Sequence, residues 1–221
     1  MPPAAHPSAA TPRAPTAGVD AVVVGAGPNG LVAANVLVDA GWSVLVIEAA
    51  PSPGGAVRSA ELTEPGFLHD VCSSFYPMAV ASPALGRLGL ERYGLRWREA
   101  PSVLAHPALD GTCPVLERDP ARTAADLDRY VPGEGEAWLD LVARWEQWRG
   151  PLLDVLLGPF PPVRAAARLA ARTRRDLLRT VRTLLLPVRR LGEEQLRSDQ
   201  ARRLLAGAAL HADLPPEATL S

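Results

Sequence analysis

The chain has 221 residues, which at roughly 150 residues per domain corresponds to between one and two domains. Its hydrophobic content of 48% suffices for a buried core, and no run reaches the roughly 18 uninterrupted apolar residues of a membrane-spanning helix. The net charge is −1, with no lysine, two cysteines and four scattered histidines. This excludes Schiff-base chemistry on lysine, a disulfide scaffold, a CxxC redox centre and a histidine- or cysteine-based metal site.

The N-terminal segment is rich in Pro, Ala, Ser and Thr and lacks the apolar run of a secretory signal. We therefore expect residues 1–17 to form a disordered tail and the protein to be cytoplasmic.

The first ordered segment is predicted to be a compact βαβ unit. Val19–Val24 is an almost unbroken apolar run, typical of a strand buried on both faces of a parallel sheet. The glycine-rich turn Gly25–Gly30 leads into a helix over Asn29–Ala40, and Ser43–Ile47 forms the second strand. The helix residues expected on its buried side are Leu31, Ala34, Asn35 and Val38.

Beyond this unit, turn signals divide the chain into hairpins and then helices. The predicted elements are strands at 57–62 and 67–71, a helix over 82–94, strands at 103–109 and 112–116, helices starting at 119 and 135, a helix end at 150–151, and helices on both sides of Pro187. The helix from 135 carries apolar side chains at helical spacing, which we expect to lie in the core: Trp138, Leu141, Val142, Trp145 and Trp148.

The strongest chemical signal is the motif Gly25-Ala26-Gly27-Pro28-Asn29-Gly30, which follows a strand and opens a helix. Gly25 permits the tight turn, Gly27 leaves room for a diphosphate near the backbone, and Gly30 lets the helix pack closely on the sheet. The helix N-terminus offers free N–H groups to an anion. Glu48, 18 residues after Gly30, can accept hydrogen bonds from a ribose and would repel a 2′-phosphate. The competing interpretation is a glycine turn that binds nothing.

FAD and NAD share this βαβ arrangement, so the first glycines do not separate them. A second diglycine, Gly54-Gly55, follows Glu48 and suggests another close approach of the backbone to the cofactor, which favours FAD. The alternative for this diglycine is an ordinary flexible loop.

Residues 19–59, which contain both glycine motifs, resemble the FAD-binding start of the phytoene desaturase and amine oxidase superfamily. Pro65–Pro83 is similar to its phytoene-dehydrogenase-related branch, which includes the pyridine nucleotide-disulfide oxidoreductase domain-containing protein 2 type, and Leu210–Pro215 resembles a segment of that branch. The resemblance implies FAD as the cofactor. The positions that it assigns to FAD are Gly25, Ala26, Gly27, Pro28, Asn29, Gly30, Glu48, Ala49, Gly54 and Gly55. Many relatives carry arginine directly after the diglycine, where this chain has Ala56, and Arg58 is the nearest arginine that could take its place.

The expected fold class is α/β, with an incomplete Rossmann-like FAD-binding domain over 18–117 and a mainly helical substrate or cap region over 118–221. Family members are markedly longer and no third parallel strand is evident, so we expect a truncated chain that binds FAD poorly, is inactive alone and has a missing C-terminal half as its partner.

The resemblance implies a FAD-dependent oxidoreductase, a dehydrogenase or desaturase acting on an apolar, isoprenoid-type substrate. The alternatives are an NAD-dependent dehydrogenase and a non-catalytic dinucleotide-binding fragment or split subunit. No catalytic residue is assigned, because His69, Asp70 and His211 are better explained as structural hydrogen-bonding groups.

Six arginines recur at steps of three and four and are predicted to share one helix face: Arg164, Arg168, Arg172, Arg175, Arg179 and Arg182. A solvated or internally paired helix face is the favoured interpretation. A peripheral contact with anionic lipid is the second. Nucleic acid is not expected as a partner, because no aromatic side chains alternate with the charges.

Overall fold

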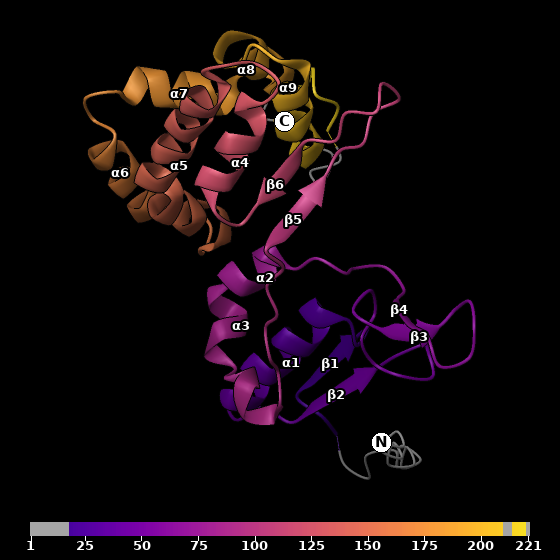
Figure 1. Ribbon diagram of the computed structural model, residues 1–221. Coiled ribbons are helices and arrows are strands. Elements are labelled where there is room, and N and C mark those ends of the chain that lie inside the picture. The colour runs from indigo at the N-terminus through magenta and orange to yellow at the C-terminus, as the bar shows by residue number, and fades with distance from the viewer. Residues whose placement is uncertain (1–17, 210–213, 220–221) are drawn as a thin grey trace. The chain divides into compact units, whose positions relative to one another are not determined.

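The computed structural model of the chain describes residues 18–209 and 214–219 (Figure 1). The chain forms two compact units, one ending at Gly94 and the other beginning at Leu95. This division precedes the boundary expected after residue 117, because the second hairpin packs against the helix that follows it. The expected disordered tail, His211 and most of the segment Leu210–Pro215 lie outside the described residues.

The first unit is built around a parallel strand pair and its connecting helix. Its elements are β1 (Ala21–Val24), α1 (Pro28–Asp39), β2 (Val44–Ile47), β3 (Ser59–Glu61), β4 (Leu68–Asp70), α2 (Pro77–Ala81), α3 (Pro83–Arg87) and the 3-10 helix η1 (Leu90–Tyr93). β1 and β2 run parallel in register from Ala21 opposite Val44 to Val24 opposite Ile47, and α1 packs against both (Figure 1). The predicted βαβ unit is therefore confirmed.

The sheet of β1 and β2 is covered on one face only, so the predicted burial of the first strand on both faces is wrong. A Cβ built on Gly30 of α1 would lie 3.4 Å from the Cγ1 atom of Val23, so Val23 faces the helix. Alternate residues of a strand point to opposite faces. Accordingly Val22 and Val24 point away from α1 and are 51% and 82% exposed.

The helix α1 presents a different face to the sheet from the predicted one. Ala34 is buried as expected, but Asn35 and Val38 are exposed, and Leu37 is half-buried instead. The close approach at Gly30 sets this rotation, because it brings the first turn of α1 against the end of β1.

The segment after β2 keeps the predicted first hairpin but breaks the predicted helix of residues 82–94. β3 and β4 are antiparallel, with Ser59 opposite Asp70. Ser82 caps α3 by accepting a hydrogen bond from the Leu85 N–H at 3.3 Å, as its position predicts. The helix then stops because Gly89 takes a left-handed φ of 58°, and η1 forms separately beyond it.

The second unit is a hairpin followed by helices. Its elements are β5 (Ser102–Ala105), β6 (Val115–Glu117), α4 (Pro120–Asp128), α5 (Glu134–Leu157), α6 (Val163–Arg172), α7 (Leu177–Leu185), α8 (Val188–Gln195) and α9 (Asp199–Ala209). The second predicted hairpin is present, and the Asp119 carboxylate caps α4 by accepting from the Ala121 N–H at 2.9 Å.

The core of this unit lies where α4, α5 and α9 meet. Its buried apolar residues are Ala124, Leu127, Trp138, Leu196, Ala201 and Leu204. The buried Glu134 carboxylate joins the first residue of α5 to the start of α9, since it accepts hydrogen bonds from the N–H groups of Arg197 at 2.9 Å and Ser198 at 3.1 Å. The prediction of a tryptophan core is correct for Trp138 but wrong for Trp145, which is exposed.

α5 continues through Pro151 to Leu157, so the helix end predicted at Gly150-Pro151 is wrong. A proline ring clashes with the backbone and Cβ of a preceding helical residue. The residue before Pro151 is Gly150, which has no Cβ to meet the proline ring. The helix therefore tolerates Pro151 at the cost of one backbone hydrogen bond. In the described part of the chain, no helix combines the length and apolarity needed to span a bilayer.

Candidate dinucleotide-binding site

The turn between β1 and α1 forms the centre of the candidate site. The Gly25 N–H donates to the Ile47 carbonyl at 2.7 Å, which extends the β1–β2 pairing by one residue. Gly25 then adopts a φ of 95°, a left-handed value that favours glycine and reverses the chain. Gly27 is the N-cap of α1, and Pro28 occupies the first turn, where its missing N–H costs nothing.

Gly30 packs the helix directly on this turn. A Cβ at this position would lie 2.0 Å from the Gly25 carbonyl oxygen, far inside contact distance. At Gly27, by contrast, there is room for a Cβ, because its nearest neighbour would be the Gly55 Cα at 3.9 Å, an ordinary van der Waals distance. Gly30 is therefore required by the packing of the chain itself, whereas Gly27 leaves open space beside the backbone.

The N-terminus of α1 presents backbone donors that the chain leaves unused. Among the residues that the structure describes, the N–H groups of Gly27, Asn29 and Gly30 have no hydrogen-bond acceptor, while the Leu31 N–H donates to the Gly27 carbonyl at 2.9 Å. Free N–H groups and the helix dipole together make such a terminus favourable for an anion. The donor set fits a diphosphate.

Glu48 closes the other side of this turn. One carboxylate oxygen, Oε2, accepts from the Ala26 N–H at 2.6 Å, and the other, Oε1, accepts from the Ala50 N–H at 2.8 Å. These bonds, first that of Ala50 and then that of Ala26, hold the pKa of the Glu48 carboxyl below its ordinary value. A carboxylate has about four acceptor sites, so two remain for the hydroxyls of a ribose.

The second diglycine lies on the first glycine turn. The Gly54 N–H donates to the Ala26 carbonyl at 2.9 Å, and a Cβ on Gly55 would come within 3.0 Å of the Gly27 Cα. Both residues have left-handed φ values, 131° and 57°. The interpretation as an unconstrained loop is therefore excluded, because backbone contacts fix the diglycine against the turn.

The structure brings the predicted positions from Gly25 to Gly30, Glu48, Ala49, Gly54 and Gly55 together around the turn between β1 and α1. Arg58 is exposed, and its charge acts on the Glu48 carboxylate without a hydrogen bond between the two. The backbone N–H of Ala50 is a contributor that sequence analysis missed. Every residue except proline has a backbone N–H group, so the residue type at position 50 does not indicate that this group donates to Glu48. The only hint in the sequence is the small side chain of Ala50, which does not obstruct a tight turn after the acid.

The six arginines do not share one helix face, so that prediction is wrong. α6 ends at Arg172, where the Thr173 hydroxyl donates to the Leu169 carbonyl at 2.9 Å, and α7 starts only at Leu177. Two of the six are paired within the chain, Arg168 with Asp154 at 2.9 Å and Arg182 with Glu194 at 2.8 Å. Internal pairing, the favoured interpretation, therefore holds for these two.

Comparisons with known proteins agree with this geometry. Residues 23–88 match the family described as "NAD(P)-binding Rossmann-like domain". The chain is 32% identical over 131 residues to a limonene dehydrogenase subunit of Castellaniella defragrans, a match that covers 58% of this chain and 23% of that protein. It is 45% identical over 94 residues to putrescine oxidase of Kocuria rosea, covering 42% of this chain and 19% of that protein. The matches thus span less than a quarter of each relative.

A solved structure supports the fold. A variant of putrescine oxidase, from a redesign of its cofactor binding, aligns over 91% of this chain and 40% of its own, with a TM-score of 0.50 and 22% sequence identity. The chain is therefore mixed α/β and begins with a Rossmann-like dinucleotide-binding unit.

Proposed function

We propose that this chain is the dinucleotide-binding part of a FAD-dependent oxidoreductase. The observation that carries the proposal is the position of Glu48, whose carboxylate lies at the N–H-rich start of α1, 2.6 Å from the Ala26 nitrogen. The two curated relatives are named as a dehydrogenase subunit and an oxidase, which supports redox chemistry. The family resemblance of residues 19–59 supports FAD over NAD.

Each part of the site would hold a different part of the cofactor. The free N–H groups of Gly27, Asn29 and Gly30 would bind the diphosphate, and the two open acceptor sites of Glu48 would bind the ribose. The backbone of Ala26, Pro28, Ala49 and the diglycine Gly54-Gly55 would line the adenosine and diphosphate, with Arg58 as a nearby cation. FAD, when bound, supplies the hydride or electron transfer, and the protein positions and tunes it.

The exposed face of the β1–β2 sheet indicates that this unit is covered in the active protein. Val22, Val24 and Ile47 are large apolar side chains with about half or more of their surface exposed. Exposed apolar strands pair readily with other chain segments. We infer that further segments, on this polypeptide or on a separate C-terminal half, pack on this face and complete the flavin site.

The substrate that we propose is apolar, of the isoprenoid type that the phytoene-dehydrogenase-related branch implies. One relative is named for limonene, an apolar hydrocarbon, whereas putrescine oxidase is named for a diamine. A purified assembly that oxidises limonene-like hydrocarbons but not diamines would support this choice, and the reverse preference would overturn it.

The test of the cofactor is calorimetric titration of the full chain with FAD and with NAD. We expect FAD to bind, but too weakly to copurify as a stoichiometric yellow complex. Glu48→Gln should weaken binding by about tenfold or more, because hydrogen bonds to a charged acceptor are lost. Glu64→Gln, in the exposed turn between β3 and β4, is the matched control.

The outcomes separate the alternatives. Tighter binding of NAD than of FAD would favour the NAD-dependent dehydrogenase. No binding of either, or equal binding by wild type and Glu48→Gln, would refute the proposed site. Co-purification with a separately encoded C-terminal half that restores flavin reduction would identify a split enzyme, and co-purification without activity would favour a non-catalytic subunit.

A further inference from the structure

The second unit contains a pocket remote in sequence from the glycine motifs. It has a volume of about 500 Å³ and lies between α5 and the segment that joins α6 to α7. α5 contributes Arg144, Gln147 and Trp148, which lie on one helix face because they are three and four residues apart. The end of α6, the joining segment and α7 contribute the other lining residues, among them Arg172, Arg174, Arg175, Asp176 and Arg179.

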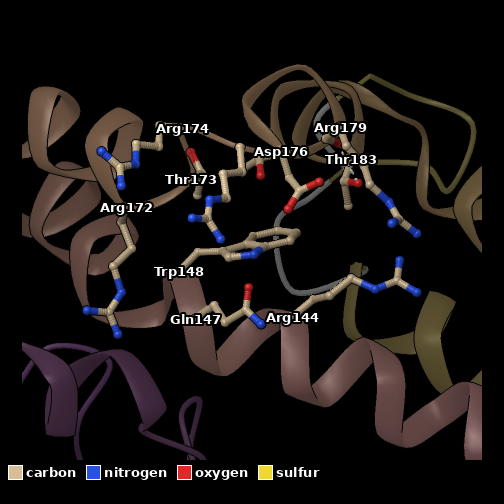
Figure 2. A pocket seen from close by; sticks show the side chains of 11 residues that line it. Arg144, Gln147, Trp148, Arg172, Thr173, Arg174, Asp176, Arg179 and Thr183 are labelled. Carbon is tan, nitrogen blue, oxygen red and sulfur yellow. Dashed lines mark hydrogen bonds between the residues drawn. The ribbon is translucent and has the colours of Figure 1, made fainter.

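The side chains of this pocket combine a flat apolar surface with surrounding cations. Figure 2 shows the Trp148 indole between α5 and the chain segment above it, with Arg172 and Arg174 on one side and Arg144 and Arg179 on the other. Five arginines line the pocket against one acidic residue, Asp176.

These cations differ from others of the same chain because no carboxylate neutralises them. In the described residues, none of the five pocket arginines has an acidic oxygen within 4.0 Å. Arg144 donates to the neutral Gln195 Oε1 atom at 3.0 Å, which orients its guanidinium and leaves its charge uncompensated. By contrast Arg168 and Arg182, just outside the pocket on the same segment, are paired with Asp154 and Glu194.

Such an arrangement favours an anion. Like charges gathered around one pocket repel one another, and that repulsion is relieved when a multivalent anion lies among them. Guanidinium groups match the geometry of phosphate oxygens through paired N–H donors.

We propose that this pocket is a binding site for a phosphate-bearing ligand with at least two negative charges, such as a diphosphate or a phosphomonoester. Its volume is in the range of small-molecule sites. Its lining residues all belong to the second unit, whereas the proposed FAD site is built from residues of the first. The ligand can be a free metabolite or the headgroup of an anionic lipid.

The helix beside the pocket gives a means to separate these two sources. Leu178, Val181 and Leu185 of α7 are exposed at helical spacing, and Leu178 is 86% exposed. A helix with cations and exposed apolar side chains can lie at a bilayer surface, with its apolar residues in the acyl boundary. A lipid headgroup therefore requires these leucines and valine, whereas a free diphosphate does not.

The experiment compares two double variants of the full chain with equal charge change. Arg174→Gln/Arg179→Gln removes two pocket cations, and Arg98→Gln/Arg122→Gln removes two exposed arginines outside it. Binding of inorganic pyrophosphate is measured by calorimetry at low salt. Binding to vesicles with and without phosphatidic acid in phosphatidylcholine is measured by sedimentation, and circular dichroism checks folding.

We expect the pocket variant to bind pyrophosphate, or vesicles with phosphatidic acid, at least about tenfold more weakly than the wild type. The control variant should stay within about twofold, since distant surface charges are screened. If the source is lipid, Leu178→Gln abolishes vesicle binding and leaves pyrophosphate binding intact. If neither probe binds, or both double variants weaken binding equally, the pocket is not a phosphate site.

Discussion

Two glycines of the same turn should respond in opposite ways to the same added methyl group. Gly30→Ala places a Cβ 2.0 Å from the Gly25 carbonyl oxygen, and this backbone atom cannot rotate away. The N-terminus of α1 must therefore separate from the end of β1. Gly27→Ala meets only the Gly55 Cα at 3.9 Å, and its φ of −75° suits any residue.

The magnitudes follow from these contacts. Overpacking costs about 1–3 kcal/mol, and a rigid backbone partner puts Gly30→Ala at about 3 kcal/mol. Gly27→Ala should cost about 1 kcal/mol or less, because alanine is a poorer N-cap than glycine. Its Cβ projects instead into the space where a diphosphate would approach, so it should weaken FAD binding by about tenfold or more.

Hydrogen exchange read by mass spectrometry over residues 21–47 measures the first effect, and calorimetric titration with FAD measures the second. A loss of about 3 kcal/mol corresponds to roughly hundredfold lower protection. Wild-type protection in Gly30→Ala, or wild-type FAD affinity in Gly27→Ala, would show that the reasoning about this turn is wrong.

Three further perturbations test other contacts. Glu134→Gln removes the buried carboxylate that accepts from the Arg197 and Ser198 N–H groups just before α9, and it should destabilise the second unit by about 1–3 kcal/mol. The readout is a lower thermal midpoint than in exposed Glu136→Gln, and equal midpoints would contradict it. The Glu48 carboxyl should titrate in NMR experiments with a pKa below its ordinary value. The stability that this carboxylate gives to the folded state is then complete at pH values above the ordinary pKa and is lost as the pH falls through the lowered pKa; an ordinary pKa would contradict this. Gly207→Ala would bring a Cβ within 2.0 Å of the His106 ring and should loosen α9, seen as faster exchange there; unchanged exchange would count against the contact.

The βαβ unit and its glycine positions were predictable because each feature has a local cause in the sequence. Gly25 and Gly30 are required by a turn and a close packing, and Glu48 follows at the distance set by one helix and one strand. The capped helix starts at Ser82 and Asp119 were predictable for the same reason.

The errors arise where tertiary context decides. The exposed face of β1 follows from helix α1 covering one side of the sheet only, which hydrophobicity along Val19–Val24 does not encode. α5 passes Pro151 because Gly150 precedes it, so a usual helix-ending signal fails. The regular arginine spacing continued across a turn at Thr173, so periodicity alone predicted one helix where the chain forms two.

A chain of hydrogen bonds links three separate segments of the candidate site. The Ala50 and Ala26 N–H groups both donate to Glu48, and the Ala26 carbonyl accepts from the Gly54 N–H. Glu48 thus positions both glycine loops before any ligand arrives, which lowers the ordering cost of binding.

Glu48→Asp tests this positioning role apart from charge. The aspartate keeps the negative charge but is shorter by one methylene, so it cannot span the Ala26 and Ala50 nitrogens together. We expect faster exchange of the Ala26 and Gly54 amides and FAD binding weakened by about tenfold, similar to Glu48→Gln. If Glu48→Asp kept wild-type exchange and affinity, charge alone would account for the acid, and the hydrogen-bonded link between the loops would have no part in binding.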